Sequence, residues 1–555
     1  SYIRAFRWAT DRIGDSGVVA FVSNGGWVDG NTADGMRLSL ADEYSHIYVY
    51  NLRGNQRTAG ELSRKEGGKI FGGGSRNTVA IFIGIKDPKY SGSCTIHYSD
   101  IGDYLTREQK LQIVAANTVG SVEWQAITPS PEGDWINQRD EEFSTWTPIG
   151  DKSGGMRLFS DHSAGLLSAR DAWVYNFSSS VLRAQVSATI DFYNKQVTDF
   201  AKWCDDHQLA DRKAYVETFI SMDGTKVSWG GSLKDDLVRG KHISFAPKDV
   251  FRSMYRPFHS QYVYFNAQLN QRRYTLPAMF PTPNHTNMGF YVVGVGNAKP
   301  FSALMIGVMP DVSFWGSGQG HYFPRWTYQS AEDDEGTLNF DSLQPVDSTG
   351  YRRLDNITDD VLGLYRSQVN GHVTKDDIFY YVYGVLHDPD YRTRYAADLK
   401  KMLPHIPIPD SAERFEHVSD IGRQLGQLHL NYEAAEPFPL EVQLKPGTDP
   451  AKRETWRIEK MKWRSKTDRS AIVYNSAVTI AGIPDTAHDY MLGSRSALDW
   501  IIDRYQVKTD KASGIVNDPN AWCDEHDDPT YIVDLIKKVT TVSVRSVELV
   551  AELAS

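Results

Sequence analysis

Cysteine is scarce in this chain of 555 residues, and long apolar runs are missing. The three cysteines, Cys94, Cys204 and Cys523, are too few and too scattered for a disulfide framework or a zinc site. No stretch approaches the roughly 20 apolar residues that cross a bilayer. The N-terminal segment SYIRAFRWATDRIGDSG lacks the basic end and apolar core of a signal peptide. The composition therefore predicts a globular cytoplasmic protein with no membrane partner.

Sequence motifs for nucleotide binding are also missing. The chain contains no Pro-Pro pair and no Walker A sequence, so no ATP site is visible. The segment GVG at 294–296 has Lys299 where a third glycine would complete G-x-G-x-x-G, and this segment and GSGQG at 316–320 are interpreted as turns. The 14 tryptophans and 29 tyrosines leave a carbohydrate-active or other hydrolase open, although no pair of carboxylates stands out in a shared motif.

Positive charge is concentrated in one loop, although the formal net charge of the chain is -10. Residues 47–52 and 78–86 are rich in β-branched and aromatic side chains and predict the two strands of a hairpin. The long segment between them, residues 53–76, is called the basic loop here. It carries Glu61, Glu66 and the cations Arg53, Arg57, Arg64, Lys65, Lys69 and Arg76. Because DNA phosphates respond to a local patch of positive charge, the basic loop predicts contact with a phosphate backbone.

Phe71 is the aromatic side chain of the glycine-rich part of the basic loop, and Gly67, Gly68, Gly72, Gly73 and Gly74 flank it. Glycine lets a backbone approach a ligand closely, so the pattern suits stacking of Phe71 on a base. The alternative is that Phe71 packs beneath the loop and that the cations are simply solvated.

The order of predicted elements gives the fold class of the first part of the chain. A helix at 3–13, a strand at 18–23 and a helix at 34–44 precede the hairpin, and a strand at 94–98 and a helix at 106–116 follow it. This order predicts part of an open α/β sheet that ends in a β-hairpin. The sheet is incomplete, since its first helix has no preceding strand to pack against.

The composition changes at about Trp124, so residues 124–150 are predicted to link residues 1–123 to a second domain at 151–555. This larger domain is expected to be of mixed α+β class, with a helical part at 151–435 and a strand-rich part at 436–555. An amphipathic pattern predicts a long helix at 181–207, and Thr374 and Asp377 form a capping box at the start of another.

Four consecutive side chains in the larger domain are candidates for reading bases. Asn270, Gln271, Arg272 and Arg273 belong to the residue types that make bidentate contacts in the major groove. A solvated turn is the alternative for this run.

Several long motifs resemble Type ISP restriction-modification enzymes. They are NLRGNQRTAGE, GGKIFGGGSRNTVAIFIGIKDP, SARDAWVYN, DDIFYYVYGVLHDPDYRTRYAADLKKMLPHIP, SALDWIIDRYQV and SGIVNDPN, and together they extend over nearly the whole chain. The resemblance implies that residues 1–123 are the C-terminal half of a Rossmann-like adenine-N6 DNA methyltransferase domain. It implies that residues 151–555 are the target-recognition domain, and that Phe71 stacks on a flipped-out adenine.

The resemblance also implies what the intact enzyme requires. Double-stranded DNA is the expected substrate in defence against phage, with S-adenosylmethionine as cofactor. The upstream methyltransferase half, a helicase-like ATPase and a nuclease are expected in the same polypeptide. The family's cofactor turn and [Asn/Asp/Ser]-Pro-Pro-[Tyr/Phe/Trp] motif are absent from this chain, so neither catalytic residues, nor a metal, nor bound cofactor is expected in it. DNA is expected between the two domains. The alternative is a DNA-binding specificity subunit that works with a separate catalytic subunit.

Overall fold

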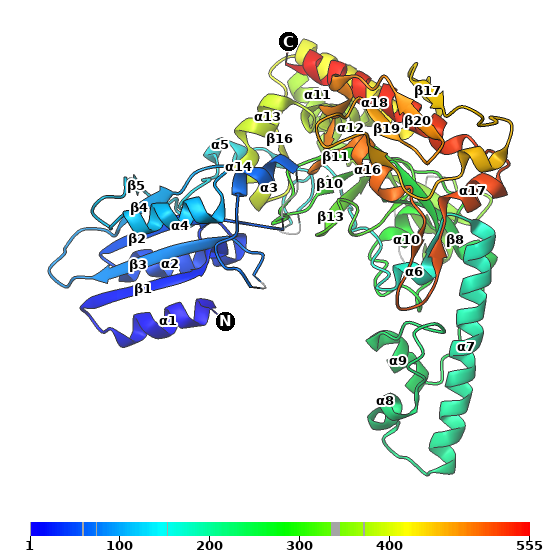
Figure 1. The fold of residues 1–555 in the computed structure, drawn as a ribbon, viewed down its shortest axis with the longest axis horizontal. Coiled ribbons are helices and arrows are strands. Elements are labelled where there is room, and N and C mark those ends of the chain that lie inside the picture. Colours follow the sequence, from blue (N-terminus) through cyan, green and yellow to red (C-terminus); the bar gives the residue numbers. More distant parts are fainter. Residues whose placement is uncertain are drawn as a thin grey trace. The chain divides into compact units, whose positions relative to one another are not determined.

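The computed structural model describes residues 2–57, 60–73, 75–151, 154–334, 345–369 and 372–554, which form two compact units (Figure 1). Unit 1 comprises Ser1–Trp146, Val295–Phe301 and Tyr391–Pro407, and unit 2 comprises Thr147–Gly294, Ser302–Asp390 and Ile408–Ser555. The boundary therefore lies after Trp146, whereas the sequence predicted a domain at 1–123 and a linker at 124–150. The predicted linker belongs largely to unit 1, because Trp135 is buried there against Trp27.

Unit 1 is built on a twisted sheet with strand order β1-β3-β2-β4-β5. Its strands are β1 (Gly17–Asn24), β2 (His46–Arg53), β3 (Val79–Lys86), β4 (Thr95–Asp100) and β5 (Gln125–Ile127). The predicted hairpin is present, since β2 and β3 pair antiparallel. β3 is also antiparallel to β1, whereas β2 and β4 are parallel. The helices and the remaining strand of unit 1 are α1 (Tyr2–Arg12), α2 (Asp34–Glu43), α3 (Gly60–Glu66), α4 (Arg107–Ala116), α5 (Glu141–Thr145), α14 (Ala396–Lys401) and β16 (His405–Ile406), together with the end of α13 (Pro389–Arg394).

Alternation along β2 gives this sheet two different faces. Ile47 and Val49 are buried in a cluster with Phe6 of α1 and Leu40 of α2. The side chains of the opposite parity, such as Leu52, are buried in a second cluster beside α4. Period-two alternation places successive side chains on opposite faces, so unit 1 is a sheet covered by helices on both sides. The predicted α/β class is correct for this unit.

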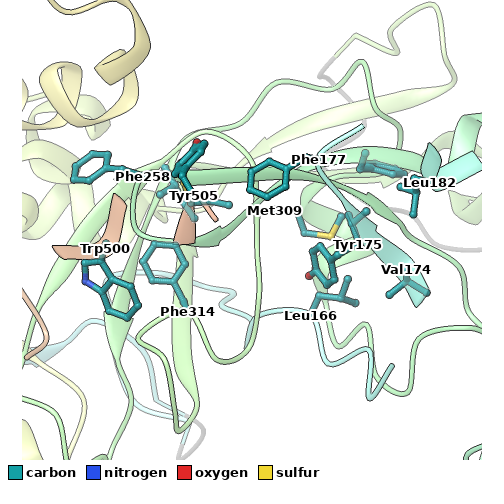
Figure 2. Packing of buried hydrophobic residues seen from close by; sticks show 14 of the residues in the cluster. Leu166, Val174, Tyr175, Phe177, Leu182, Phe258, Met309, Phe314, Trp500 and Tyr505 are labelled. Atoms are coloured by element: carbon teal, nitrogen blue, oxygen red, sulfur yellow. The ribbon is translucent and has the colours of Figure 1, made fainter. Parts of the chain in front are cut away.

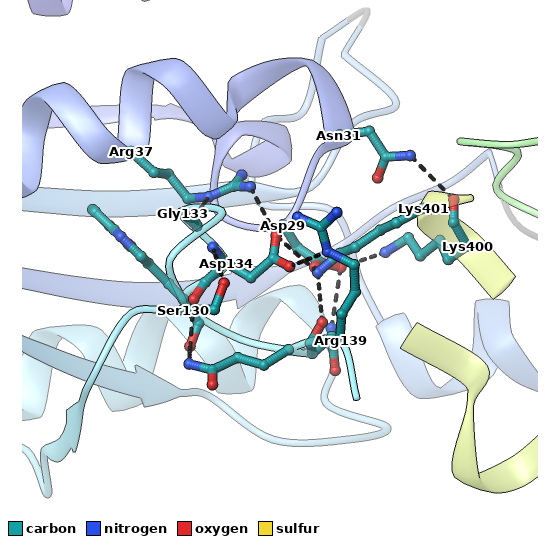
Figure 3. A network of polar contacts seen from close by, with 12 residues as sticks. Asp29, Asn31, Arg37, Ser130, Gly133, Asp134, Arg139, Lys400 and Lys401 are labelled. Carbon is teal, nitrogen blue, oxygen red and sulfur yellow. Dashed lines mark hydrogen bonds and ion pairs between the residues drawn. The ribbon is translucent and has the colours of Figure 1, made fainter. Parts of the chain in front are cut away.

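A segment from far along the chain completes unit 1. Residues 391–407, called the return segment here, contain α14, and Lys401 of α14 lies in a network of polar contacts with Asp29 and Asp134 (Figure 3). Two consecutive helices, α13 and then α14, lead the chain through this segment.

Unit 2 combines several small sheets with helices. The sheet orders are β12-β8-β9-β7, β11-β10-β13 and β17-β20-β19-β18, with the pairs β14-β15, β21-β22 and β23-β24. The strands are β6 (Thr147–Pro148), β7 (Tyr175–Asn176), β8 (Val250–Arg256), β9 (His259–Tyr264), β10 (Gly289–Val293), β11 (Ala303–Ile306), β12 (Met309–Pro310), β13 (Gly320–Pro324), β14 (Trp326–Ser330), β15 (Tyr351–Asp355), β17 (Glu441–Leu444), β18 (Lys462–Trp463), β19 (Ala471–Val473), β20 (Val478–Ala481), β21 (Met491–Leu492), β22 (Arg495–Ser496), β23 (Lys508–Thr509) and β24 (Val516–Asn517).

The helices of unit 2 are α6 (Asp171–Val174), α7 (Ser179–Asp206), α8 (Val216–Phe219), α9 (Gly231–Val238), α10 (Leu276–Met279), α11 (Asp359–Val369), α12 (Lys375–Val385), α15 (Ala412–Leu430), α16 (Ala497–Arg504), α17 (Pro519–Glu525) and α18 (Tyr531–Leu553). The mixed class is as predicted. The division into a helical part and a strand-rich part is different, because strands β7 to β15 lie within 151–435 and the long helix α18 lies within 436–555.

One apolar cluster runs through unit 2 and includes Leu166, Tyr175, Phe314 and Trp500 (Figure 2). The predicted long helix is present as α7, which projects with α8 and α9 away from the sheets of this unit (Figure 1). Among the described residues, no helix is long and apolar enough to cross a membrane.

Candidate nucleic-acid interface

The basic loop is fixed to unit 1 by a buried lysine of α4. Lys110 is fully buried, and its Nζ donates hydrogen bonds to the carbonyl oxygens of Leu52 at 3.0 Å, Glu66 at 2.7 Å and Gly68 at 3.0 Å. A buried ammonium is costly unless hydrogen-bond acceptors replace its water. Burial lowers the pKa of Lys110, as expected for a cation removed from water. One side chain thus ties the end of β2 to the end of α3 and the segment beyond it.

The glycines of the basic loop have two different roles. A Cβ on Gly67 would lie 2.2 Å from the carbonyl oxygen of Leu105, and a Cβ on Gly68 would lie 2.3 Å from the backbone nitrogen of Arg107. Gly67 and Gly68 are therefore required for close packing of the loop on the start of α4. Gly72 and Gly73 have open space around them, and Gly74 lies outside the described residues.

Ile70, and not Phe71, packs beneath the basic loop. Ile70 is 7% exposed and lies in the cluster that contains Tyr50 and Leu52. The carbonyl oxygen of Ile70 also accepts a hydrogen bond from Nε of Arg107 at 2.9 Å. Phe71 is 47% exposed, which is the placement that a stacking side chain requires. Ile70 therefore occupies the buried position beneath the loop, and Phe71, the predicted stacking residue, is left exposed.

The six predicted cations are not equivalent. Arg57, Arg64, Lys65 and Arg76 are exposed, and Lys69 is half-buried. Arg53 instead forms ion pairs with Asp100, at 2.6 Å, and with Asp103. Because these two carboxylates compensate its charge, Arg53 stabilises the end of β2 more than it adds to an external positive surface.

The predicted base-reading run lies in unit 2 and pairs with another strand-like segment. Arg272 and Leu167 exchange two backbone hydrogen bonds, at 2.9 and 3.0 Å. Asn270 is 2% exposed, and its Oδ1 accepts a hydrogen bond from the backbone nitrogen of Asn266 at 2.8 Å. Arg273 is half-buried over the ring of Phe265. Of the four predicted side chains, Gln271 and Arg272 are the two that the fold exposes.

Of the two glycine-rich segments interpreted as turns, the first forms a turn at 295–296, and the second forms a bend at 316–318 that leads into β13. Gly296 has φ +73°, and Gly316 and Gly318 also have positive φ. In the part of the chain that the structure describes, no group of three His, Cys, Asp or Glu side chains could hold a metal ion.

Sequence reasoning missed the residues that hold the basic loop in place. Lys110 looks like any lysine on the polar face of a helix, and nothing in its local sequence indicates that it is buried. β2 and β4 pair in parallel, and Asp100 of β4 is the register partner of Asn51 of β2. This pairing brings Asp100, which is distant in sequence, within reach of Arg53. A pairing register of this kind is a tertiary property, so local sequence could not reveal it.

Comparison with protein families and solved structures gives a consistent result. The family model described as the Type ISP C-terminal specificity domain matches residues 157–535. A nuclease-deletion mutant of the Type ISP restriction-modification enzyme LlaGI, in complex with a DNA substrate mimic, is 39% identical with a TM-score of 0.82 over 100% of this chain. The ATP-dependent Type ISP enzyme LlaBIII bound to DNA is 36% identical with a TM-score of 0.83, also over 100% of this chain.

A third similar structure is the DrdV–DNA complex, which is 28% identical with a TM-score of 0.79 over 99% of this chain. The comparison with curated proteins found no match. The chain covers 40% of the LlaGI chain, 34% of the LlaBIII chain and 52% of the DrdV chain. The structures to which it is similar are therefore longer proteins.

Proposed function

The chain belongs to the Type ISP family of restriction-modification enzymes, and from this premise we propose that it recognises a specific duplex DNA sequence for adenine-N6 methylation. It does so as part of a longer polypeptide that also carries the upstream methyltransferase half, a helicase-like ATPase and a nuclease. The observation that carries the proposal is the likeness of the whole chain to Type ISP enzymes in complex with DNA.

In this proposal the sheet of unit 1 is the C-terminal half of a Rossmann-like methyltransferase domain. The antiparallel strand β3 between β1 and β2 supports this assignment, because the resemblance implies a sheet that ends in such a hairpin. The methyl donor of the intact enzyme is S-adenosylmethionine. This chain by itself supplies neither the cofactor turn nor the catalytic motif, so it neither binds the cofactor nor methylates DNA.

The basic loop contacts DNA phosphates, and Phe71 stacks on the flipped target adenine. Two features support these roles. Arg57, Lys65 and Arg76 are exposed, so their charged groups are accessible to a phosphate. Lys110 fixes the backbone just before the loop, at Leu52, and within it, at Glu66 and Gly68, and a preorganised loop loses less conformational entropy when it binds.

Base reading is assigned to unit 2, through Gln271 and Arg272. Phosphate contacts are the same for every sequence, so the cations of the basic loop cannot by themselves specify a site. Gln and Arg make bidentate contacts to adenine and guanine in the major groove, and the fold exposes both side chains. Pairing of Arg272 with Leu167 fixes their backbone, which makes the direction of the side chains reproducible.

Titration of duplex DNA at several salt concentrations tests this division of labour. Arg57→Gln and Lys65→Gln should weaken binding to the recognised site and to a scrambled duplex alike, and each should lower the slope of log K against log salt by about one. Gln271→Ala and Arg272→Ala should instead cost about 1–3 kcal/mol at one base position, with little effect on the salt slope.

Glu441→Gln is a control, because Glu441 is an exposed residue of unit 2 at the start of β17. If the basic-loop variants lose discrimination between sequences while Gln271→Ala and Arg272→Ala lose only overall affinity, the assignment of roles is wrong.

A further inference from the structure

Tyr104 is a strained and exposed aromatic residue in the turn between β4 and α4. Its φ is +60°, in the left-handed region, and its side chain is 57% exposed. A bulky residue rarely adopts this backbone conformation, because its Cβ lies too close to the following carbonyl oxygen. Glycine or asparagine would adopt it with less strain, and an exposed ring adds little to the apolar core. Neither backbone preference nor packing therefore accounts for a tyrosine at this position.

The turn that contains Tyr104 lies at the same edge of the sheet as the basic loop. β2 and β4 are parallel, so their carboxyl ends lie at one edge. The basic loop begins at the end of β2, and the turn follows the end of β4. In open α/β sheets, ligands bind beyond the carboxyl ends of the strands. Tyr104 is thus placed where a ligand of unit 1 is expected.

Backbone hydrogen bonds join this turn to the basic loop. The backbone nitrogen of Tyr104 donates to the carbonyl oxygen of Lys65 at 3.1 Å, and that of Gly68 donates to the carbonyl oxygen of Leu105 at 2.9 Å. Lys65 and Gly68 belong to the basic loop, so the loop and the turn form one hydrogen-bonded frame. This frame carries two exposed aromatic side chains, Tyr104 and Phe71.

The charges beside Tyr104 suit a nucleic acid. Lys65, which accepts the hydrogen bond from the backbone of Tyr104, has an exposed side chain. The carboxylate of Asp103, the residue before Tyr104, is paired with Arg53. Surfaces that bind unpaired nucleotides combine cations, which contact the backbone, with aromatic side chains on which the bases stack. The frame contains both kinds of side chain.

We propose that Tyr104 stacks on a nucleotide of the bound DNA, as a second aromatic contact in addition to Phe71. An exposed ring gains a partner when an unpaired base stacks on it, and backbone strain of this kind is concentrated at functional sites. This contact rests on the proposed function in that DNA is the ligand, but it requires no sequence specificity.

Titration of the chain with a short single-stranded oligonucleotide, followed by fluorescence anisotropy, tests the contact without requiring base flipping. Tyr104→Ala should weaken binding about tenfold, the effect of losing one stacked base. Tyr104→Phe keeps the ring and should keep the affinity. Tyr104→Ala should also leave the salt slope unchanged, because an uncharged side chain neutralises no phosphate.

Trp8→Ala is the matched control for the loss of an exposed aromatic side chain from unit 1. Trp8 is 60% exposed and belongs to α1. This helix packs on the face of the sheet opposite to that of α4. Trp8→Ala should therefore bind the oligonucleotide as tightly as the unmodified chain.

Tyr104→Gly separates stacking from a purely structural role. Glycine adopts the left-handed conformation without strain, so the urea midpoint of hydrogen exchange in α4 peptides should be higher in Tyr104→Gly than in Tyr104→Ala. Both variants lack the ring and should lose the same affinity. If affinity instead follows the midpoint, so that Tyr104→Gly binds more tightly than Tyr104→Ala, Tyr104 acts through the fold and the proposal is overturned.

A double substitution with Phe71→Ala shows whether the two rings share a base. If both stack on one base, the loss of affinity in the double variant is smaller than the product of the two single losses. If they stack on separate nucleotides, the two losses multiply. Both results support a stacking role for Tyr104.

The proposal is overturned if Tyr104→Ala binds the oligonucleotide as tightly as the unmodified chain, or if Tyr104→Phe loses as much affinity as Tyr104→Ala. Equal losses in Trp8→Ala and Tyr104→Ala, or no binding by the unmodified chain, would overturn it as well. Failure of the unmodified chain to bind duplex DNA, with binding of the single strand still dependent on Tyr104, would contradict the proposed function alone.

Discussion

Ile70 and Phe71 are neighbours in the chain with opposite environments, and this contrast locates the candidate stacking residue. Ile70 is buried beneath the basic loop, so the loop already has its apolar anchor without Phe71. An exposed phenylalanine gains little from its position in the folded protein. Stacking on an unpaired base, worth about 1–3 kcal/mol, would give its ring a partner.

Replacing Phe71 by Ala in the intact enzyme should weaken the fluorescence rise of 2-aminopurine placed at the target adenine. The reason is that an extrahelical base without a stacking partner returns more readily to the duplex. Phe71→Trp keeps an aromatic face and should preserve the signal. An unchanged signal in Phe71→Ala would remove Phe71 from base recognition.

At single positions, the sequence predicted residue types better than environments. The positive charge of the basic loop is evident from composition, but it did not show that Arg53 is paired with Asp100 and Asp103. In the same way, the sequence shows the amide and guanidinium groups of residues 270–273, but it does not show that Asn270 is buried. Burial depends on strand pairing and on contacts far apart in the chain, which a local pattern does not contain.

At the level of elements, the contact between α12 and α15 shows how glycine determines packing in unit 2. A Cβ on Gly422 of α15 would lie 2.0 Å from the carbonyl oxygen of Tyr380 on α12. A Cβ on Gly384 of α12 would lie 2.5 Å from the carbonyl oxygen of Val418 on α15. The backbones of the two helices are therefore in direct contact, and a larger residue at either position would push the helices apart.

Gly422→Ala should destabilise unit 2 by about 3 kcal/mol, because the added methyl group meets backbone atoms that cannot move separately from the helix. Gly363→Ala is the control, since Gly363 lies in α11 with open space around it. That change should be neutral or stabilising by up to about 1 kcal/mol, as expected for alanine in a helix. Urea unfolding followed by hydrogen exchange of unit 2 peptides measures both. Equal effects of the two substitutions would contradict the close contact of α12 with α15.

Elements with strong local signals were predicted well. The apolar spacing of α7 and the capping box of Thr374 and Asp377 in α12 are present as expected. The segment TWRIEKMKW at 455–463 lies in the part of the chain predicted to be strand-rich, but it contributes only the end of a 3-10 turn at Arg453–Trp456 and the short strand β18. The strand is short because the side chain of Asn520 makes hydrogen bonds with both the backbone N–H and the carbonyl oxygen of Ile458. These two groups are therefore not available for pairing with a neighbouring strand.

At the level of the whole molecule, the chain leaves unit 1 and later returns to it. The return segment contributes Lys401, whose side chain is 4% exposed and lies 3.1 Å from a carboxylate oxygen of Asp134. Asp134 also forms ion pairs with Arg139 at 2.9 Å and with Arg37 at 3.4 Å (Figure 3). These cations hold the pKa of Asp134 below its usual value despite its burial. No sequence pattern relates Asp134 to Lys401, which are far apart in the chain, so this part of unit 1 could not be predicted.

Lys401 and Lys400 are adjacent lysines that should differ in their effect on the stability of unit 1. Lys401→Met removes a buried cation from Asp134 and should cost about 2–3 kcal/mol, less than a complete loss of partners because Arg37 and Arg139 remain. Lys400→Met removes a cation that is 43% exposed and paired with Asp29, so it should cost less than about 1 kcal/mol. A single unfolding free energy is not defined for a chain of two units, so the measurement is the urea midpoint of hydrogen exchange in β2 and β3 peptides. Because both substitutions remove the same charge from the same turn of α14, a larger effect of Lys401→Met isolates the buried contact. Similar effects of the two substitutions would mean that the return segment is held by its apolar contacts and not by this ion pair.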